Sequence, residues 1–332
     1  MAARFWVGGS GIWDASNTAN WSTTSGGAGG ASVPTSSDYV TINSLSGNGT
    51  IVLGQSVTIQ GIDIRTYVGT LDFNGFEINS AGNAITSPRC DGSATIIGNG
   101  VINLTYAGGT GTRTIGTGVM TESNSISVNV TSGSDIIAFG TSTFKNFNTT
   151  GFSGTLNVGT RTFYGNVTIG ATTVMGAGGT NTNTFAKTTG TQTVTTNGKT
   201  LDFPITVNGA GGTVEFTDAL TQGSTRAFTF TNGTVKLKNG VTSTVGAFAT
   251  SGTNQKFLES TLAGSQATLS QASGTVSVSN LTIKDINATG GATWNAYTTN
   301  NNVDAGNNSG WDFSLQLGRY IYTVRKNKRI LP

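Results

Sequence analysis

Carboxylates are the side chains best suited to hydrolytic chemistry here, because the 332-residue chain contains no histidine. Cleavage of a glycosidic bond requires two carboxyl groups roughly 5–10 Å apart. Asp72 with Glu77 and Glu215 with Asp218 are close in sequence, and Asp202 precedes Glu215 by one repeat unit. However, 15 acidic residues in a chain of this length produce such near pairs by chance. We therefore interpret them as solvated surface acids and predict no catalytic residues and no enzymatic activity.

The other residue types offer no stronger reactive site. Cys90 is the only cysteine, and a nucleophilic cysteine needs a neighbouring base, so we interpret it as a free structural thiol. The same composition argues against a transition-metal site, which uses histidine or several cysteines. Asp304 lies among asparagines at 300–302 and 307–308, as in an oxygen-rich calcium loop, but the segment lacks a second carboxylate. We expect an ordinary turn there, and neither a metal nor an organic cofactor.

The composition predicts a folded, all-β chain with a narrow core. Hydrophobic residues make up 35% and charged residues 10%, while the net charge is only +3, so the usual signature of disorder is incomplete. Threonine favours pleated strands, and the 49 glycines together with many asparagines favour left-handed turns between them. Only four prolines interrupt the chain.

A short motif recurs through the middle of the chain. Each copy alternates apolar and polar residues over three to five positions and is bounded by Gly or Asn-Gly, as in residues 165–170 and 274–278. Residues 200–203 (Thr-Leu-Asp-Phe) repeat residues 70–73 letter for letter. Alternation with a period of two places the apolar side chains on one face of a strand. No segment has helical periodicity, so the pattern predicts many short strands.

Two architectures satisfy this pattern, a single-stranded parallel β-helix (a solenoid) and a row of sandwiches or barrels. The β-helix is favoured because the motif recurs over about 250 residues without a linker, and because small polar residues occupy the turns. With roughly 20–25 residues in each coil, residues 40–313 would form about 11–13 coils. At about 4.8 Å per coil, the rod would be some 50–60 Å long.

The two ends differ from the repeat in the way that caps would. Three of the five tryptophans, Trp6, Trp13 and Trp21, lie within residues 1–40, and Trp294 and Trp311 lie near the other end. The exposed apolar end of a stacked body must be covered, and indole rings are suited to that task. We therefore predict an N-terminal cap at 1–40, a β-helix body at 41–290 and a C-terminal cap at 291–318. An aromatic platform for carbohydrate is the alternative for residues 1–40.

The last residues, 319–332, form a basic segment that we interpret as an assembly arm. Five of the 18 basic residues lie there, which leaves 13 against 15 acids in the rest of the chain. A short strand over residues 320–324 could pair with a neighbouring subunit, and the charges after it could pair with acidic groups. A solvated tail is the alternative. The residues predicted to carry assembly are Tyr320, Tyr322, Arg325, Lys326, Lys328 and Arg329.

Features of targeting and of nucleic-acid binding are missing. The apolar stretch after Met1 is too short for a secretory signal, and no run approaches the length of a membrane span. The basic residues are not spread along one face of the body, as a nucleic-acid interface requires. We expect synthesis in a cytoplasm without export, and no nucleic-acid or membrane partner.

Both end segments resemble known proteins. The opening with Gly9, Gly11, Trp13 and Asn20-Trp21, and the closing Asp-x-Gly-Asn-Asn-x-Gly-Trp at 304–311, are similar to segments of pectin-lyase-like parallel β-helix proteins. Such proteins occur in bacteriophage virions and among bacterial surface adhesins. Enzymatic members of the family cluster acids on one coil face, and no matching set is found in this sequence.

The resemblance implies a structural virion protein of a bacteriophage, made in the host cytoplasm and located in the virion. It would assemble as an oligomeric appendage or fibre, with a homotrimer favoured, and contribute to host attachment. Its partners would be itself, other virion proteins and, as a candidate, a host-surface glycan. The alternatives are a capsid decoration or cement protein, a polysaccharide-cleaving tailspike and a bacterial surface adhesin.

Overall fold

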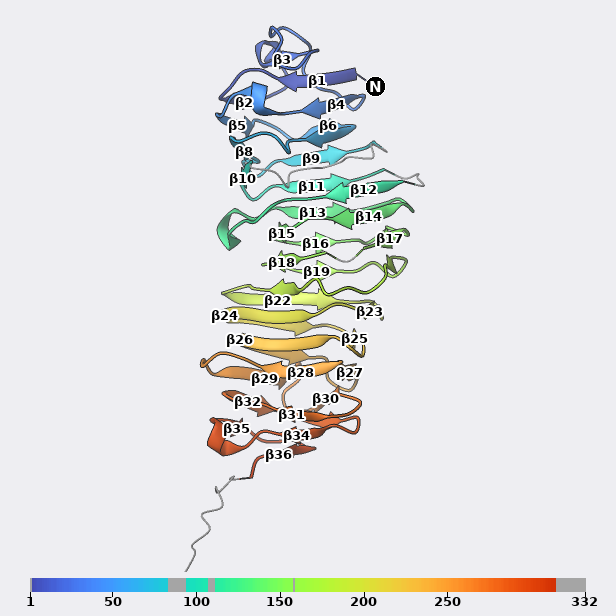
Figure 1. The fold of residues 1–332 in the computed structure, drawn as a ribbon, viewed down its shortest axis with the longest axis vertical. Coiled ribbons are helices and arrows are strands. Elements are labelled where there is room, and N and C mark those ends of the chain that lie inside the picture. Colours follow the sequence, from blue (N-terminus) through green and yellow to red (C-terminus); the bar gives the residue numbers. More distant parts are fainter. Residues whose placement is uncertain (1, 83–93, 107–110, 158, 315–332) are drawn as a thin grey trace, which may run out of the picture.

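The chain folds as one continuous parallel β-solenoid. The computed structural model describes residues 2–82, 94–106, 111–157 and 159–314. Nearly all of it is β structure, with parallel sheets stacked into about 11 turns. Figure 1 shows the coils stacked in sequence order along one axis, from β1 at one end to β36 at the other. The predicted β-helix is confirmed, and a row of separate sandwiches is excluded because one sheet of 16 strands runs along the body.

The strands of the coils form three faces. Within a coil the chain passes through face three, then face one, then face two. Face one is the main path of the long sheet, from β6 to β35; the other four strands of that sheet branch from β24 and β26 onto face three. Its strands are β6 (Val57–Ile59), β9 (Glu77–Ser80), β11 (Val101–Leu104), β13 (Ser127–Val130), β16 (Phe147–Asn148), β19 (Val167–Thr168), β22 (Gly190–Thr195), the second parts of β24 (Ile205–Phe216) and β26 (Ala227–Leu237), β29 (Lys256–Ser260), β32 (Leu281–Lys284) and β35 (Val303–Asp304).

Face two consists of the strands that follow face one in each coil. They are β1 (Ala2–Trp6), β4 (Asp38–Thr41), β7 (Gly61–Asp63), β12 (Thr112–Ile115), β14 (Ile136–Phe139), β17 (Thr155–Leu156), β20 (Val174–Met175), β23 (Thr200–Leu201), β25 (Thr221–Gln222), β27 (Thr242–Thr244), β30 (Ala267–Ser270) and β33 (Ile286–Thr289).

Face three consists of the strands that precede face one. They are β2 (Gly11–Trp13), β5 (Thr50–Leu53), β8 (Thr70–Asp72), β10 (Thr95–Ile97), β15 (Ser142–Phe144), β18 (Arg161–Phe163), β21 (Asn183–Phe185), the first parts of β24 and β26, β28 (Ala247–Thr250), β31 (Thr275–Ser277), β34 (Thr293–Asn295) and β36 (Trp311–Asp312). Outside the faces lie β3 (Trp21–Ser22) and four 3-10 turns, η1 (Thr18–Asn20), η2 (Ser44–Ser46), η3 (Glu122–Asn124) and η4 (Thr298–Asn300).

The core is a set of in-register apolar columns. On face one, Ile78, Ile102 and Val128 are aligned on three successive strands, and all three are fully buried. Their neighbours in sequence point outward, as the alternation predicts. Coil length varies, since 26 residues separate Ile102 from its in-register partner Val128, whereas 20 separate Phe147 from Val167. The variation is taken up in the turns, so the inward columns stay aligned.

Two strands are more than twice as long as the three to five residues expected from the sequence. β24 has 12 residues and β26 has 11, because each continues around a corner from face three to face one. Register shifts between Val207 and Thr213 mark the bend. A side chain at Gly212 would collide with the carbonyl oxygen of Lys187 in the preceding coil, so only glycine allows the backbones to stack there.

Turns and corners follow the expected chemistry. Among the described residues with positive φ that are not glycine, all are asparagine except Asp285. Several corners are also held by buried amide side chains. The amide nitrogen of Gln222 donates to the carbonyl oxygens of Phe203 and Ala227, each at 2.9 Å. Asn302 similarly donates to Val278 and Tyr297. These bonds satisfy backbone groups where the strand ladder stops.

Candidate functional site: end caps and outer faces

The N-terminal end is closed by three indoles. Trp21 contacts Trp6 and Trp13 edge-on, with ring centroids 5.1 and 5.0 Å apart, and no more than 1% of any of the three residues is exposed. Trp6 Nε1 donates to the Gly9 carbonyl oxygen at 2.9 Å. A sugar could not stack on rings that are buried to this extent, so the arrangement fits a cap rather than a carbohydrate platform.

The backbone at this end is closed as well. β1 pairs in parallel with β4 and β2 with β5, so both strands belong to the stack itself. On its other edge β1 pairs antiparallel with β3, the only antiparallel pairing within the described part of the chain. This pairing covers part of an edge that would otherwise recruit another chain.

The C-terminal end carries the other two tryptophans. Trp294 and Trp311 lie in register on β34 and β36 with ring centroids 4.9 Å apart, and Trp294 Nε1 donates to Thr289. From Trp294 a chain of ring contacts continues into the body, with centroids 5.5 to 6.3 Å apart. Its members are Phe248, Phe228, Phe216, Phe185, Phe163 and Phe144. This phenylalanine column was not predicted from the sequence.

The first two candidate acids do not converge. Asp72 ends β8 on face three and accepts a hydrogen bond from the backbone N–H of Asn74 at 2.8 Å. Glu77 begins β9 on face one and accepts from the amide nitrogen of Asn103 in the next coil at 2.9 Å. The two carboxylates therefore belong to different sheets and are bound to different neighbours.

Two of the three remaining candidates are also bound to their own partners. Arg226 Nε lies 2.7 Å from Asp202, and this hydrogen bond holds the pKa of the Asp202 carboxyl below its usual value. A general acid requires the opposite shift. Asp218 accepts from the backbone N–H of Thr196 at 2.9 Å. Glu215 lies on face one, in register with Lys236. Asp202 and Asp218 are thus each bound to a neighbouring coil.

The asparagine-rich loop at 300–308 is a hydrogen-bonded turn. Asp304 accepts from the N–H of Gly306 and from the amide nitrogen of Asn308. Asp285 accepts from the amide nitrogen of Asn307 at 2.6 Å and from the N–H of Gly264 at 3.0 Å. The asparagine amides thus present donor nitrogens, which cannot bind a cation, to both carboxylates. No group of three or more potential metal ligands occurs in the described ranges.

Asp285→Asn should lower the free energy of unfolding by about 1 kcal/mol at pH 7, through the loss of two hydrogen bonds to a carboxylate. The bond from Asn307 lowers the pKa of Asp285 below 3.8. Its stabilisation is therefore present above that value and is lost as the pH falls through the lower pKa of the folded state. Urea unfolding of both proteins at pH 7, 5 and 2.5 measures this. A difference that stays constant down to pH 2.5 would contradict the assignment.

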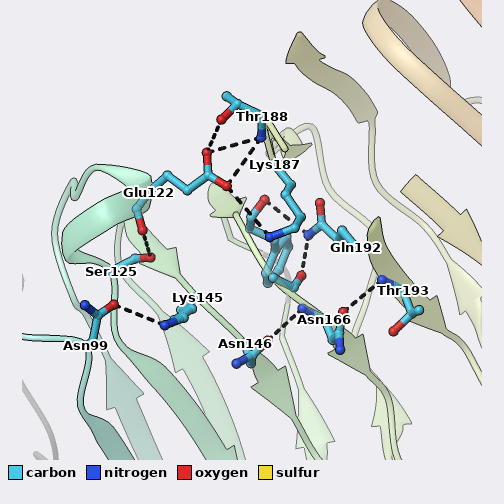
Figure 2. A network of polar contacts seen from close by, with 12 residues as sticks. Asn99, Glu122, Ser125, Lys145, Asn146, Asn166, Lys187, Thr188, Gln192 and Thr193 are labelled. Carbon is cyan, nitrogen blue, oxygen red and sulfur yellow. Dashed lines mark hydrogen bonds and ion pairs between the residues drawn. The ribbon is translucent and has the colours of Figure 1, made fainter. Parts of the chain in front are cut away.

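A strap crosses several coils on one side of the body, as Figure 2 shows. Glu122, in η3, accepts hydrogen bonds from the N–H of Thr188 at 3.2 Å and from its hydroxyl, and Lys187 Nζ lies 3.9 Å away. On the same side, Lys145 donates to Asn99 at 3.1 Å and the N–H of Asn166 donates to Asn146 at 2.8 Å. The contacts of Glu122 and of Lys145 join coils that are not adjacent along the stack, whereas the bond between Asn146 and Asn166 joins adjacent coils.

Replacing Glu122 with Gln should release this strap. We expect faster hydrogen exchange at the Thr188 amide and a loss of about 1 kcal/mol in local opening free energy, since the carboxylate is partly solvated. Exchange measured by mass spectrometry on peptides covering residues 117–126 and 186–192 tests this. Val119→Ala, in the first peptide, alters a side chain that is 85% exposed; it is the matched control and should leave both peptides unchanged.

The outer faces differ in charge. On face one, Glu215, Lys236, Glu259 and Lys284 succeed one another in register, and Lys236 Nζ lies 3.8 Å from Glu259. On face three, the outward positions of five successive strands carry no charge. We call this surface the Thr/Ala face; its central column is Thr162, Thr184, Thr206, Thr229 and Ala249, flanked by Thr160, Thr182, Pro204, Ala227 and Ala247.

Several residues singled out by the sequence lie outside the described ranges. They are Cys90 and all six residues assigned to the assembly arm, Tyr320, Tyr322, Arg325, Lys326, Lys328 and Arg329. Within the part of the chain that is described, no helix is long and apolar enough to cross a membrane.

Comparison with protein families, with curated proteins and with solved structures finds no match for this chain.

Proposed function

We propose that this chain is a structural protein of a bacteriophage virion, a rod that assembles as a homotrimeric appendage or fibre and contributes to host attachment. The observation that carries the proposal is the single apolar core, which runs through about 11 turns between two aromatic ends. Such a body transmits force along one axis and has no hinge between modules. The resemblance of the end segments to virion β-helix proteins supports the same role.

The Thr/Ala face supports lateral association. It is flat, because its strands are in register, and burying it would desolvate no charged group. Face one, with its column of charged residues, would be less suited to the centre of an assembly. In this proposal three copies pack with this face toward a common axis, and the basic arm of each copy pairs with acidic groups of its neighbour. Synthesis occurs in the host cytoplasm, and the mature protein is part of the particle.

Light scattering of the full chain and of residues 1–318 tests the assembly. We expect a trimer for the full chain and weaker association for the shortened one. Thr184→Arg should give folded monomers, whereas Thr195→Arg on face one, the matched control, should remain trimeric. A strictly monomeric protein at every concentration, with and without the arm, would refute the proposal. Locating the chain in images of intact particles would then identify its place in the virion.

The same protein can be tested for glycan cleavage. Incubation with host surface polysaccharide should release no reducing or unsaturated ends. If ends are released, and if Asp202→Asn or Glu215→Gln stops the release, the chain is a polysaccharide-cleaving tailspike.

A further inference from the structure

A small cavity lies inside the solenoid between β18 and β21 on face three and β22 on face one. Its volume is about 20 Å³. Most of its lining is apolar, including Phe163, Phe185 and Phe203. Three polar side chains also line it, Thr196, Arg161 and Asn183, and the latter two occupy in-register positions on neighbouring strands. Both point inward, and only 2% of Arg161 and none of Asn183 is exposed.

Arg161 is a buried cation with an incomplete set of partners. Its Nη2 donates to the Asn157 carbonyl oxygen at 2.7 Å, and its guanidinium carbon lies 4.1 Å from the centre of the Phe139 ring. Its buried Nε has no hydrogen-bond partner within the protein. No carboxylate in the described ranges forms an ion pair with it. Burial lowers the pKa of this guanidinium to about 9, so it still carries its charge at neutral pH.

Asn183 presents the complementary group. Its Nδ2 donates to the carbonyl oxygens of Gly159 and Asn181, each at 3.2 Å, and these two bonds fix the orientation of the amide. Its buried Oδ1 has no hydrogen-bond partner within the protein. The cavity is therefore lined by one donor and one acceptor that other protein groups leave unsatisfied, each of which would be costly to bury alone.

We infer that this cavity is a binding site for a single water molecule, which accepts a hydrogen bond from Arg161 Nε and donates one to Asn183 Oδ1. A cavity needs about 10–15 Å³ to hold one water, and a buried water typically makes two to four such bonds. An anion would match the charge of Arg161, but it would be repelled by Oδ1, which cannot turn away without breaking two bonds. The water hydrates the cation and bridges two adjacent coils.

A crystal structure at better than about 1.8 Å tests the site directly. We expect density for one water within hydrogen-bonding distance of Arg161 Nε and Asn183 Oδ1. A second crystal soaked in sodium bromide should show no anomalous peak there. A cavity without density, or a bromide peak in it, would overturn the inference.

Solution measurements give an independent readout. Oxygen-17 relaxation dispersion counts long-lived internal waters, and the count should fall by one in the double variant Arg161→Met, Asn183→Leu. Thr162→Val, on the outward side of the same strand, is the matched control and should leave the count unchanged. An unchanged count in the folded double variant would refute the site. If that variant does not fold, the wild-type crystals alone decide.

Discussion

Trp21→Ala should lower the free energy of unfolding by about 3–5 kcal/mol, the usual cost of truncating a buried aromatic side chain to alanine. Trp21 is the central ring of its cluster and touches both Trp6 and Trp13. Its removal leaves the other two indoles without their edge contacts. Because each coil of a solenoid packs mainly against its neighbours, the damage should be concentrated in the first coils. Hydrogen exchange should therefore increase most in residues 2–22 and 38–53.

Two comparisons make this prediction specific. Trp21→Phe keeps an aromatic ring and should cost less than the alanine variant. Val119→Ala alters a side chain that is 85% exposed, and it should change stability by less than about 0.5 kcal/mol. If exchange increased uniformly along the rod, the tryptophan cluster would be acting as part of a global core and not as a cap. If Trp21→Ala lowered the free energy of unfolding by less than about 1 kcal/mol, the role of the cluster as a cap would be contradicted.

The alternation of apolar and polar residues predicted the short strands, as in residues 165–170, but it was compatible with both a β-helix and a row of sandwiches. The absence of linkers and the small polar residues in the turns favoured the β-helix. The sequence did not predict that β24 and β26 would continue around a corner. That outcome depends on Gly212 approaching a carbonyl oxygen of the preceding coil, and coil-to-coil register cannot be read from one sequence.

The buried charges were missed although a signal for them was present. In the segment Arg161-Thr162-Phe163 a period of two places the arginine on the same side as the phenylalanine, and the structure buries both. The hydrogen-bond partners of the charged side chains, by contrast, could not be derived from the sequence. Thr188 follows Glu122 by 66 residues, and only the stacking of coils brings them together. The separation of the candidate acids could not be derived either, because the face and the coil on which each acid lies depend on how the coils stack.

The second buried arginine forms the other site where one substitution should have a large effect. Arg113 and Asp135 form an ion pair inside the solenoid in which 2% and 3% of the side chains are exposed. Arg113 Nη2 donates to Asp135 Oδ1 at 2.7 Å, and Arg113 Nε donates to Oδ2. The Tyr106 and Phe152 rings lie 6.0 Å from the guanidinium, so the surroundings are largely apolar. Loss of the carboxylate would leave a buried cation without its counter-ion.

Asp135→Asn, which keeps the size of the side chain, should therefore lower the free energy of unfolding by about 3–5 kcal/mol. Adding Arg113→Met removes the uncompensated charge and should recover most of that loss. Glu259→Gln breaks the solvated pair with Lys236 and should cost no more than about 1 kcal/mol. Denaturant unfolding at low and high salt distinguishes the buried pair from the solvated pair. The effect of Asp135→Asn should persist at 1 M salt, while that of Glu259→Gln should disappear. If the double variant were no more stable than Asp135→Asn, the loss would come from disrupted packing and not from the unpaired charge.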